Sequence, residues 1–536
     1  MRYFNTAGPV LCAKHYCLPP LKRLDLDEIL MLIDQEKYFV LHAPRQTGKT
    51  SSLLALMDYL NQRGEYHCLY FNMEMGQAAR EDVRQAMQAI LGELALRAQD
   101  FVQDTFPMEH WRDILAQFGE YGALNALLTH WAKASPKPLV LLIDEIDSLV
   151  GDTLISVLRQ LRSGYDKRPR LFPQSVLLCG VRDVRDYRLR GRGKEVITGG
   201  SAFNIKAKSL RLGNFDRGEV KTLYRQHTEE TGQRFEETAL AMAWELTSGQ
   251  PWLVNALGYE VCFEMERGRD RSTPVSAEMM MEAKERLILR RETHLDQLMD
   301  KLREPRVQRV VGPMLRGKSL DRAVCQDDIQ YIIDLGLVHR GEMGLQIANA
   351  IYREVVPREL GFIFQLDIES LVRPVWYVAP DGRLDVSKLL TEFQQFFRQH
   401  SEHWLERFQY KEAGPQLLMQ AFLQRIVNHG GRVEREYGLG RMRTDLLVVW
   451  PFDRAQGRPY GEGQVQRSVI ELKILYGSLE RTIAEGLEQT CKYMDRCGAE
   501  EGHLVVFDRD AEKSWESKIF HREESYQGTP VVVWGM

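Results

Sequence analysis

The sequence has 536 residues, of which 44% are hydrophobic and 27% are charged, so it can bury several cores. At about 150 residues per domain, this length predicts roughly three to four domains. It excludes a miniature protein, and the apolar content excludes a largely disordered chain. The 71 Lys and Arg residues against 75 Asp and Glu give a formal charge of -4. That balance excludes a uniformly basic nucleic-acid binder, so any such surface must be local.

Apolar runs and cysteines indicate the cellular compartment of the protein. No run of about 18 or more apolar residues appears, so we expect no membrane span, and MRYFNTAGPVLCAKHYCLPP lacks the apolar core of a signal peptide. The eight cysteines form no CxxC pair, and no second ligand pair follows Cys12, His15 and Cys17 at zinc spacing. We therefore expect reduced thiols, no zinc and a cytoplasmic location.

The chain begins with an entry segment, residues 1–37, and then alternates short apolar strands with helices. YFVLH opens residues 38–50 and leads through a loop into the helical pattern SSLLALMDYLNQRG. Further strands are predicted at 67–74, 138–147 and 175–183, with amphipathic helices over about 78–133. Buried strands that alternate with helices predict a parallel sheet with right-handed crossovers, which we assign to residues 38–215.

The middle of the chain is predicted to be mostly helical. Residues 216–289 carry helical periodicity. In residues 290–362, short helices lead to DLGLVHRGEMGLQIAN, a strand pair with Gly341 and Gly344 at its turn, which suggests a winged helix. Residues 363–400 are expected to be a connector with one helix, KLLTEFQQFFRQH.

Residues 401–536 predict another α/β part. We expect a helix at about 415–428, strands at 432–438 and 443–450, a loop at 451–467, strand SVIELKIL, a helix at 479–496 and strands HLVVFD and PVVVWG. The predicted fold class is therefore α/β, with several domains along one chain.

The stretch APRQTGKT lies between a predicted strand and a predicted helix, which is the setting of a phosphate-binding loop. Backbone N–H groups of such a loop, and of the helix that follows it, cradle phosphates. Lys49 is expected to reach the β- and γ-phosphates of ATP, and the Thr50 hydroxyl to hold Mg²⁺. Ala43 stands where the usual pattern has its first glycine. The predicted ATP-binding residues of this loop are Pro44, Arg45, Gln46, Thr47, Gly48, Lys49, Thr50 and Ser51.

The strand LVLLIDEID supplies two carboxylates at its end. Asp144 is placed to bind Mg²⁺ through water, and Glu145 to orient the water that attacks the γ-phosphate. A solvated turn would also end in carboxylates, but the lysine loop earlier in the chain favours the catalytic interpretation.

Together, APRQTGKT, LLIDEID, GVRDVRDY and SGQPWLVNA resemble the AAA-like ATPases of the STAND class, relatives of the origin-recognition ATPases. The resemblance covers roughly residues 10–360 and implies a P-loop ATPase core, a helical lid and a winged helix. It also implies that Arg182 contacts the γ-phosphate as a sensor arginine and that Pro251 lies against the nucleotide base. The alternatives are an ordinary surface arginine and a proline that starts a helix.

The densest basic stretch of the chain begins at Arg182 and is interrupted by two aspartates. Two interpretations remain open: contact with a phosphate backbone, and a solvated loop that faces a protein partner. Its basic residues are Arg182, Arg185, Arg188, Arg190, Arg192 and Lys194.

A second group of candidate catalytic residues lies near the C-terminus. Asp445 starts the strand TDLLVVW, and Glu471 and Lys473 lie two apart in SVIELKIL. Residues two apart in a strand project from the same face, and a hairpin partner can bring Asp445 beside them. Two carboxylates form a site for Mg²⁺, and the lysine offsets charge in the cleavage of a phosphodiester.

This pattern resembles the PD-(D/E)XK nuclease superfamily, whose domains have a restriction-endonuclease-like fold. The resemblance implies that Asp445 and Glu471 bind metal and that Gln489 and Tyr493, in EQTCKYMD, lie near the substrate backbone. Glu436 is a candidate for a further metal-side carboxylate. One departure stands out, because LLMQAFLQRIV has glutamines where relatives carry a first-helix glutamate, with Gln420 at that place.

The winged-helix segment QDDIQYIIDLG carries three aspartates and no Lys or Arg, which opposes phosphate contact and favours a packing role.

These features predict an ATP-controlled nuclease with ATP and Mg²⁺ as cofactors, a nucleic-acid substrate (DNA in first place) and ATP-dependent homo-oligomers. The resemblance favours a defence or mobile-element setting with a protein or phage-derived trigger. The alternative is a non-cleaving STAND-type regulatory ATPase whose degenerate nuclease domain binds DNA or a protein. An ATP-driven translocase or loader is a third hypothesis, for which the sequence has no dedicated strand-tracking feature.

Overall fold

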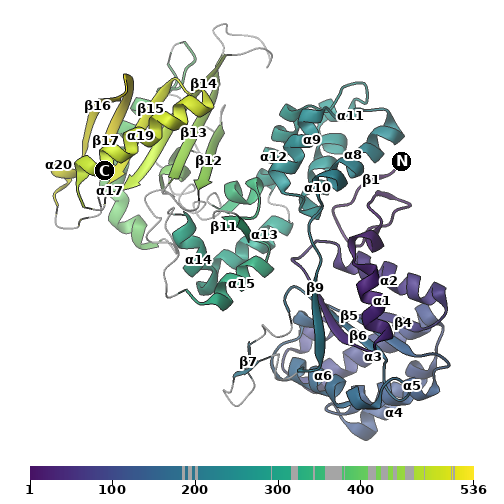
Figure 1. The fold of residues 1–536 in the computed structure, drawn as a ribbon. Coiled ribbons are helices and arrows are strands. Elements are labelled where there is room, and N and C mark those ends of the chain that lie inside the picture. The colour runs from purple at the N-terminus through teal and green to yellow at the C-terminus, as the bar shows by residue number, and fades with distance from the viewer. Residues whose placement is uncertain are drawn as a thin grey trace. The chain divides into compact units, whose positions relative to one another are not determined.

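The computed structural model describes residues 1–183, 188–190, 196–198, 203–290, 293–315, 324–341, 344–356, 377–379, 381–407, 418–423, 432–438, 443–452, 464–475, 477–508, 510 and 513–536. It divides into two compact units (Figure 1). The first comprises Met1–Arg290 with Asp334–Gly336, and the second comprises Arg291–Ile333 with Leu337–Met536. The finer domain boundaries given above stay predictions.

The first unit is built on a five-stranded parallel sheet in the order β4-β5-β6-β3-β9. Four of its strands, the three central ones and the edge strand β4, are the apolar runs that the sequence predicts, and they are buried because helices cover both faces. The strand β9 was not predicted. The strands are β3 (Tyr38–His42), β4 (His67–Asn72), β5 (Leu139–Asp144), β6 (Ser175–Gly180) and β9 (Lys206–Arg211).

Two apolar cores lie on opposite faces of this sheet (Figure 1). The first two helices, α1 (Leu26–Asp34) and α2 (Lys49–Arg63), pack on one face through side chains such as Ile29 and Leu56. The other face is covered by α3 (Val83–Val102), α4 (Phe106–Phe118), α5 (Ala123–Ala134) and α6 (Gly151–Ser163). Alternate side chains of each strand point to opposite faces, which explains why continuous apolar runs serve both cores.

A group of helices completes the first unit, as the periodicity of residues 216–289 predicts, and it is called the lid here after the role that the resemblance implies. It begins at a capping box in which the Asp216 and Glu219 side chains each accept a backbone N–H. The lid helices are α8 (Arg217–Thr231), α9 (Glu237–Thr247), α10 (Pro251–Tyr259), α11 (Glu266–Arg269) and α12 (Ala277–Arg290), with a π-helical turn at Glu260–Glu264.

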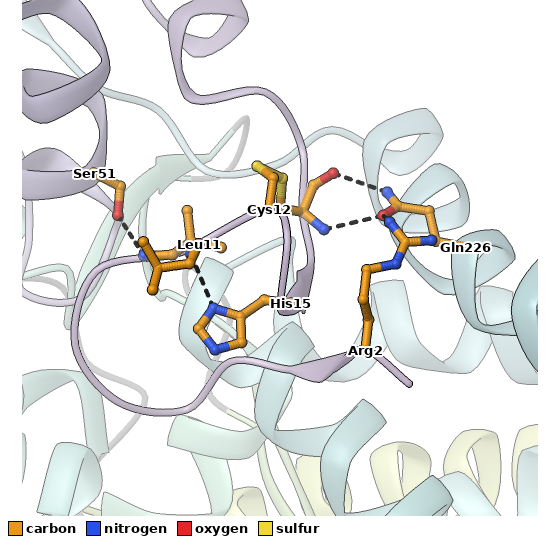
Figure 2. Close-up of a disulfide and its surroundings, with 8 residues drawn as sticks. Arg2, Leu11, Cys12, His15, Ser51 and Gln226 are labelled. Atoms are coloured by element: carbon orange, nitrogen blue, oxygen red, sulfur yellow. Dashed lines mark hydrogen bonds between the residues drawn. A yellow bond between two sulfur atoms is a disulfide. The ribbon is translucent and has the colours of Figure 1, made fainter. Parts of the chain in front are cut away.

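The entry segment forms a parallel strand pair, β1 (Tyr3–Phe4) with β2 (His15–Tyr16). The prediction of reduced thiols is wrong for one pair in this segment: Cys12 and Cys17 form a disulfide (Figure 2). The intervening turn brings their Cα atoms to 5.4 Å, within the normal reach of a disulfide. The other six cysteines are free thiols.

In the second unit, α13 (Thr293–Asp300), α14 (Pro305–Leu315) and α15 (Gln326–Asp334) precede a hairpin of β10 (Val338–Gly341) and β11 (Gly344–Ile347). Gly341 pairs with Gly344 at the turn, as the sequence predicts. Two arginines of α14 engage the acidic start of α15: Arg306 with Asp327 at 3.1 Å and Arg309 with Asp328 at 2.7 Å. These ion pairs agree with a packing role for α15.

The C-terminal part is a six-stranded mixed sheet in the order β12-β13-β14-β15-β17-β16. Strands β14, β15 and β17 are parallel, and the other neighbours are antiparallel. The sequence predicted these strands except β16. They are β12 (Arg432–Gly438), β13 (Arg443–Phe452), β14 (Gln464–Ile474), β15 (Glu501–Phe507), β16 (Phe520–Tyr526) and β17 (Thr529–Gly535).

Helices accompany this sheet. Helix α19 (Leu479–Cys497) packs on it through Ile483, Leu487 and Met494. The others are α17 (Val386–Arg407), a short helix at 418–423 and α20 (Trp515–Lys518). Among the residues that the structure describes, no helix is both long and apolar enough for a membrane crossing.

Candidate nucleotide and metal sites

The phosphate-binding loop connects the end of β3 to the start of α2. Its turn is fixed by the Thr47 hydroxyl, which donates to the Pro44 carbonyl at 2.8 Å. Gly48 has φ +91°, a conformation that favours glycine, and a Cβ there would lie 2.7 Å from a guanidinium nitrogen of Arg23. Gln46 also adopts positive φ, at 57°. The loop therefore has the tight turn that the motif predicts.

Lys49 is buried and turned back over the loop. Its ammonium group donates to the carbonyls of Ala43 and Pro44 at 2.9 and 3.0 Å. Because Lys49 and Ser51 start α2, the N-terminal N–H groups of that helix face the same loop. A cation and the N–H groups of a helix N-terminus at one loop can together bind the negatively charged phosphates of ATP.

The second motif meets the first at the edge of the sheet. The Thr50 hydroxyl donates to the Asp144 carboxylate at 2.7 Å, and Asp144 is fully buried. A hydroxyl and a carboxylate are hard oxygen donors, so this pair fits Mg²⁺. The Tyr70 hydroxyl also donates to Asp144, at 3.1 Å. Sequence reasoning missed Tyr70, whose signal was a hydroxyl-bearing ring within the otherwise apolar run of β4.

Glu145 follows Asp144 but is oriented differently. It has φ 52°, and its backbone N–H donates to the Asp144 carboxylate at 2.9 Å. Partial burial, reinforced by the charge of Asp147, raises the pKa of Glu145 above its ordinary value. A carboxylate with a raised pKa beside Thr50 and Asp144 suits the predicted role of accepting a proton from an attacking water.

Arg182 lies just beyond β6, at the edge where the predicted site is formed. It is buried and forms an ion pair with Asp334, with 3.3 Å between Nε and Oδ2. The surface alternative for Arg182 is therefore wrong. Contact with a γ-phosphate stays a prediction, and it would compete with Asp334 for the same guanidinium.

Pro251 occupies the first turn of α10, behind the N-cap Gln250, whose side chain accepts the Leu253 N–H at 2.6 Å. This is the helix-start role that the sequence left open. Contact of Pro251 with the nucleotide base stays a prediction.

Arg23 is a neighbour of the loop that the sequence did not indicate. One guanidinium nitrogen donates to the Thr47 carbonyl, and the other donates to the Gly213 carbonyl at 2.6 Å. The guanidinium lies 4.7 Å from the centre of the Phe215 ring. Burial lowers the pKa of Arg23 to about 10. Arg23 thus ties the loop to the segment that leads into the lid, and no motif in the sequence identifies it.

The C-terminal candidates occupy one row of the mixed sheet. The backbone register pairs Glu436 of β12 with Asp445 of β13, and Asp445 with Glu471 of β14. Asp445 and Glu471 are therefore opposite neighbours, as the hairpin hypothesis predicts. The side chains of Glu436 and Asp445 lie outside the described part of the structure.

Glu471 is fully buried, and the Lys473 ammonium lies 2.8 Å from its carboxylate. Lys473 also donates to the Gln489 amide oxygen, which brings α19 to the same place. Tyr493 packs at the rim of the core under α19, and Gln420 is buried within helix 418–423. Among the described side chains, no three His, Cys, Asp or Glu residues are grouped as metal ligands.

The basic stretch after β6 is only partly described. Two short strands, β7 (Arg188–Arg190) and β8 (Val196–Thr198), pair antiparallel within it. Arg185, Arg192 and Lys194 lie outside the described residues. Neither interpretation of this stretch is tested.

Comparison with known proteins gives a family match for the part of the chain that contains the first site. Residues 33–187, which contain both nucleotide motifs, match a family model described as an AAA domain. No curated protein matches the chain.

Solved structures with similar folds include a Walker-type ATPase of Pyrococcus abyssi, which is 14% identical with a TM-score of 0.40, over 66% of this chain and 99% of that one. The RuvB Holliday junction branch migration motor of Thermotoga maritima is 12% identical with a TM-score of 0.32, over 62% and 93%. Cdc6p from Pyrobaculum aerophilum is 15% identical with a TM-score of 0.35, over 66% and 94%. The family model therefore carries the assignment of an AAA-type P-loop ATPase domain.

Proposed function

From the AAA-type P-loop ATPase domain at residues 33–187, we propose that this protein is an ATP-controlled, metal-dependent nuclease. Lys49 and the backbone of the loop hold the phosphates of ATP, and Thr50 with Asp144 would hold Mg²⁺. Glu145 orients and deprotonates the attacking water, and Arg182 stabilises the γ-phosphate once it leaves Asp334. A Mg²⁺ ion held there would neutralise charge at the phosphates.

The row of acidic positions across β12, β13 and β14, with a lysine beside it, carries the nuclease proposal. Glu436, Asp445 and Glu471 are paired successively in register, and opposed positions of neighbouring strands share a face of the sheet. The Lys473 ammonium, 2.8 Å from Glu471, offsets the negative charge of a phosphodiester transition state.

Carboxylate oxygens are the donors that Mg²⁺ prefers, so Asp445 and Glu471 would hold a metal ion there. That ion would supply Lewis acidity at the phosphodiester. Gln489 orients the lysine from α19 and, with Tyr493, is proposed to face the nucleic-acid backbone.

DNA is the substrate of this proposal, and an ATP-dependent homo-oligomer is its working assembly. Both, like the trigger and the defence setting, rest on the resemblance of the motifs to STAND-type ATPases and PD-(D/E)XK nucleases.

The test is a cleavage assay of the full chain on plasmid DNA, linear DNA and RNA. Each substrate is incubated with Mg²⁺ or Mn²⁺, with and without ATP, beside Glu471→Gln. We expect metal-dependent cutting of DNA that Glu471→Gln lowers by at least about a hundredfold, the scale at which removal of a charge-stabilising group acts.

A matched control is Glu523→Gln, because Glu523 is an exposed carboxylate on β16 of the same sheet. It should cut like the parent protein. Equal cutting by Glu471→Gln and the parent would refute the nuclease assignment.

One observation favours the alternative of a non-cleaving regulatory ATPase. Helix 418–423 presents a buried Gln420 where active nucleases of this pattern often have a glutamate. In that case the C-terminal sheet binds DNA or a protein partner without cutting. ATP-dependent assembly or DNA retention with no cleavage under any metal would support this alternative.

A further inference from the structure

The entry segment bridges two sides of the nucleotide-binding unit. Between β1 and β2, the chain makes a turn that ends in the Cys12–Cys17 disulfide (Figure 2). On one side of this turn lies α2, which begins at Lys49, and on the other lie the lid helices α8 and α10. All of these elements belong to the first unit.

On the nucleotide side, the Val10 backbone N–H donates to the Ser51 hydroxyl at 3.0 Å. Ser51 lies in the first turn of α2, one residue after the predicted Mg²⁺ ligand Thr50. The neighbouring Leu11 N–H donates to the His15 ring at 3.0 Å, and the Leu11 carbonyl accepts the N–H of His15 at 2.8 Å. The turn between Val10 and His15 is therefore held by its own hydrogen bonds while its edge rests on the phosphate-loop helix (Figure 2).

On the lid side, Cys17 is held by two hydrogen bonds. Its N–H donates to the Gln226 side-chain oxygen at 3.1 Å, and its carbonyl accepts the Gln226 amide at 2.9 Å (Figure 2). The Trp252 indole of α10 donates to the Thr6 carbonyl at 2.9 Å. The same short segment thus contacts the phosphate loop through Val10 and the lid through Cys17 and Thr6.

The disulfide stiffens the connection between these contacts. It joins residues five apart, so it limits how far the turn at Val10 can move from the anchor at Cys17. Cys12 is exposed, which gives a dithiol access to the bond. A cross-link that is accessible and lies between two contacts is suited to reversible regulation.

We propose that Cys12–Cys17 is a redox site that controls how fast bound nucleotide leaves. The proposal rests on nucleotide binding at the phosphate loop. A dithiol reductant of the thioredoxin class transfers two electrons and two protons, so the S–S bond breaks, two thiols form, and the reductant becomes a disulfide. Without the cross-link, the contact of Cys17 with the lid no longer restrains the turn at Val10. The hydrogen bond between Val10 and Ser51 then breaks more often. Nucleotide then dissociates faster.

The experiment measures the release of a fluorescent ADP analogue from the full chain after a chase with unlabelled ADP. Thiol alkylation and mass spectrometry first establish the state of Cys12 and Cys17 before and after treatment with dithiothreitol. We expect reduction to speed release about three- to tenfold, the scale of one lost hydrogen bond. The double variant Cys12→Ser/Cys17→Ser should release at the fast rate in both conditions.

Cys325→Ser is the matched control, because Cys325 is an exposed free thiol in the second unit. It should keep the response to reductant. Gln226→Ala, which removes the anchor without touching a cysteine, should speed release while the disulfide is intact. Thermal melting of each variant establishes that it is folded.

The outcomes separate the two levels of the proposal. Release that is equally fast before and after complete reduction overturns the redox site and leaves nucleotide binding intact. Eight alkylated cysteines even after treatment with oxidised glutathione would also overturn it. A chain that binds no ADP analogue in either state contradicts the nucleotide switch itself.

Discussion

Two neighbouring carboxylates at the end of β5 have different surroundings. Asp144 is fully buried and accepts hydrogen bonds from the hydroxyls of Thr50 and Tyr70, which fixes its carboxylate beside Thr50, its predicted partner in binding Mg²⁺. Glu145 takes a left-handed backbone conformation and lies less deeply buried, beside Asp147. These different environments fit the proposed roles, in which Asp144 is a metal ligand and Glu145 accepts a proton.

The pKa of Glu145 gives a test of its role in ATP hydrolysis. Burial and Asp147 raise this pKa above the ordinary 4.5, and only the deprotonated form accepts a proton. We therefore expect kcat for ATP hydrolysis to fall as the pH drops through the raised pKa, with the acidic limb above pH 4.5. Glu145→Gln should bind ATP, hydrolyse it about 10²- to 10⁴-fold more slowly and lose this limb.

The measurement is the pH profile of kcat beside binding of a fluorescent ATP analogue. Glu74→Gln, an exposed carboxylate that follows β4, is the control and should retain both the rate and the limb. An unchanged acidic limb in Glu145→Gln would assign that limb to another group.

At the residue scale, the sequence predicted side chains that carry a motif and missed those that act through tertiary contact. Lys49, Thr50 and Asp144 were predicted because their spacing and flanking elements are typical of phosphate loops, and the structure brings Thr50 and Asp144 into contact. Tyr70 and Arg23 were missed, since one lies in an apolar strand and the other precedes the loop in a segment without a motif. Their roles depend on which strands become neighbours.

At the scale of elements, the path from β9 into the lid depends on one glycine. Gly249 has φ +71°, and a Cβ there would lie 1.9 Å from the Phe215 carbonyl oxygen. Its own carbonyl accepts the Phe215 N–H at 2.9 Å. The linker before α8 and the turn before α10 therefore touch backbone to backbone, which no larger residue permits.

We expect Gly249→Ala to lower the free energy of unfolding by about 1–3 kcal/mol, because alanine is strained at positive φ and collides with Phe215. Chemical denaturation of the full chain, followed by tryptophan fluorescence, measures the change. Gly213→Ala is the matched control, since a Cβ at Gly213 meets no atom within 4 Å. Equal stability of the two variants would show that the backbone at Gly249 relaxes freely.

In the two large sheets, the strands that the sequence missed, β9 and β16, both lie at an edge, whereas every central strand and the edge strands β4 and β12 were predicted. Central parallel strands are buried on both faces and appear as apolar runs such as YFVLH and LVLLID. The edge strands β9, KAKSLR, and β16, FHREESY, are rich in charged residues that face water. These strands form because they pair with a neighbouring strand, and the sequence of the segment alone does not show which strand that is.

At the scale of the whole molecule, the two candidate sites lie in different compact units. The phosphate loop and Glu145 belong to the first unit, and Glu471 with Lys473 belongs to the second. Each unit has its own sheet and its own apolar core. We therefore expect a change at one site to leave the chemistry of the other intact, and in the proposed function bound nucleotide provides the control of the second site by the first.

This separation predicts reciprocal behaviour of two variants of the full chain. Lys49→Ala removes the cation at the loop, so it should lose ATP binding and any effect of ATP on DNA cleavage, while cleavage without ATP matches that of the parent. Glu471→Gln should keep ATP hydrolysis within about twofold of the parent and lose cleavage, because Glu471 is buried in the other unit. ATP hydrolysis and DNA cleavage are measured on the same preparations.

If Lys49→Ala cuts with the same ATP response as the parent, nucleotide acts elsewhere than this loop. If Glu471→Gln also abolishes ATP hydrolysis in a folded protein, the two sites operate as one unit.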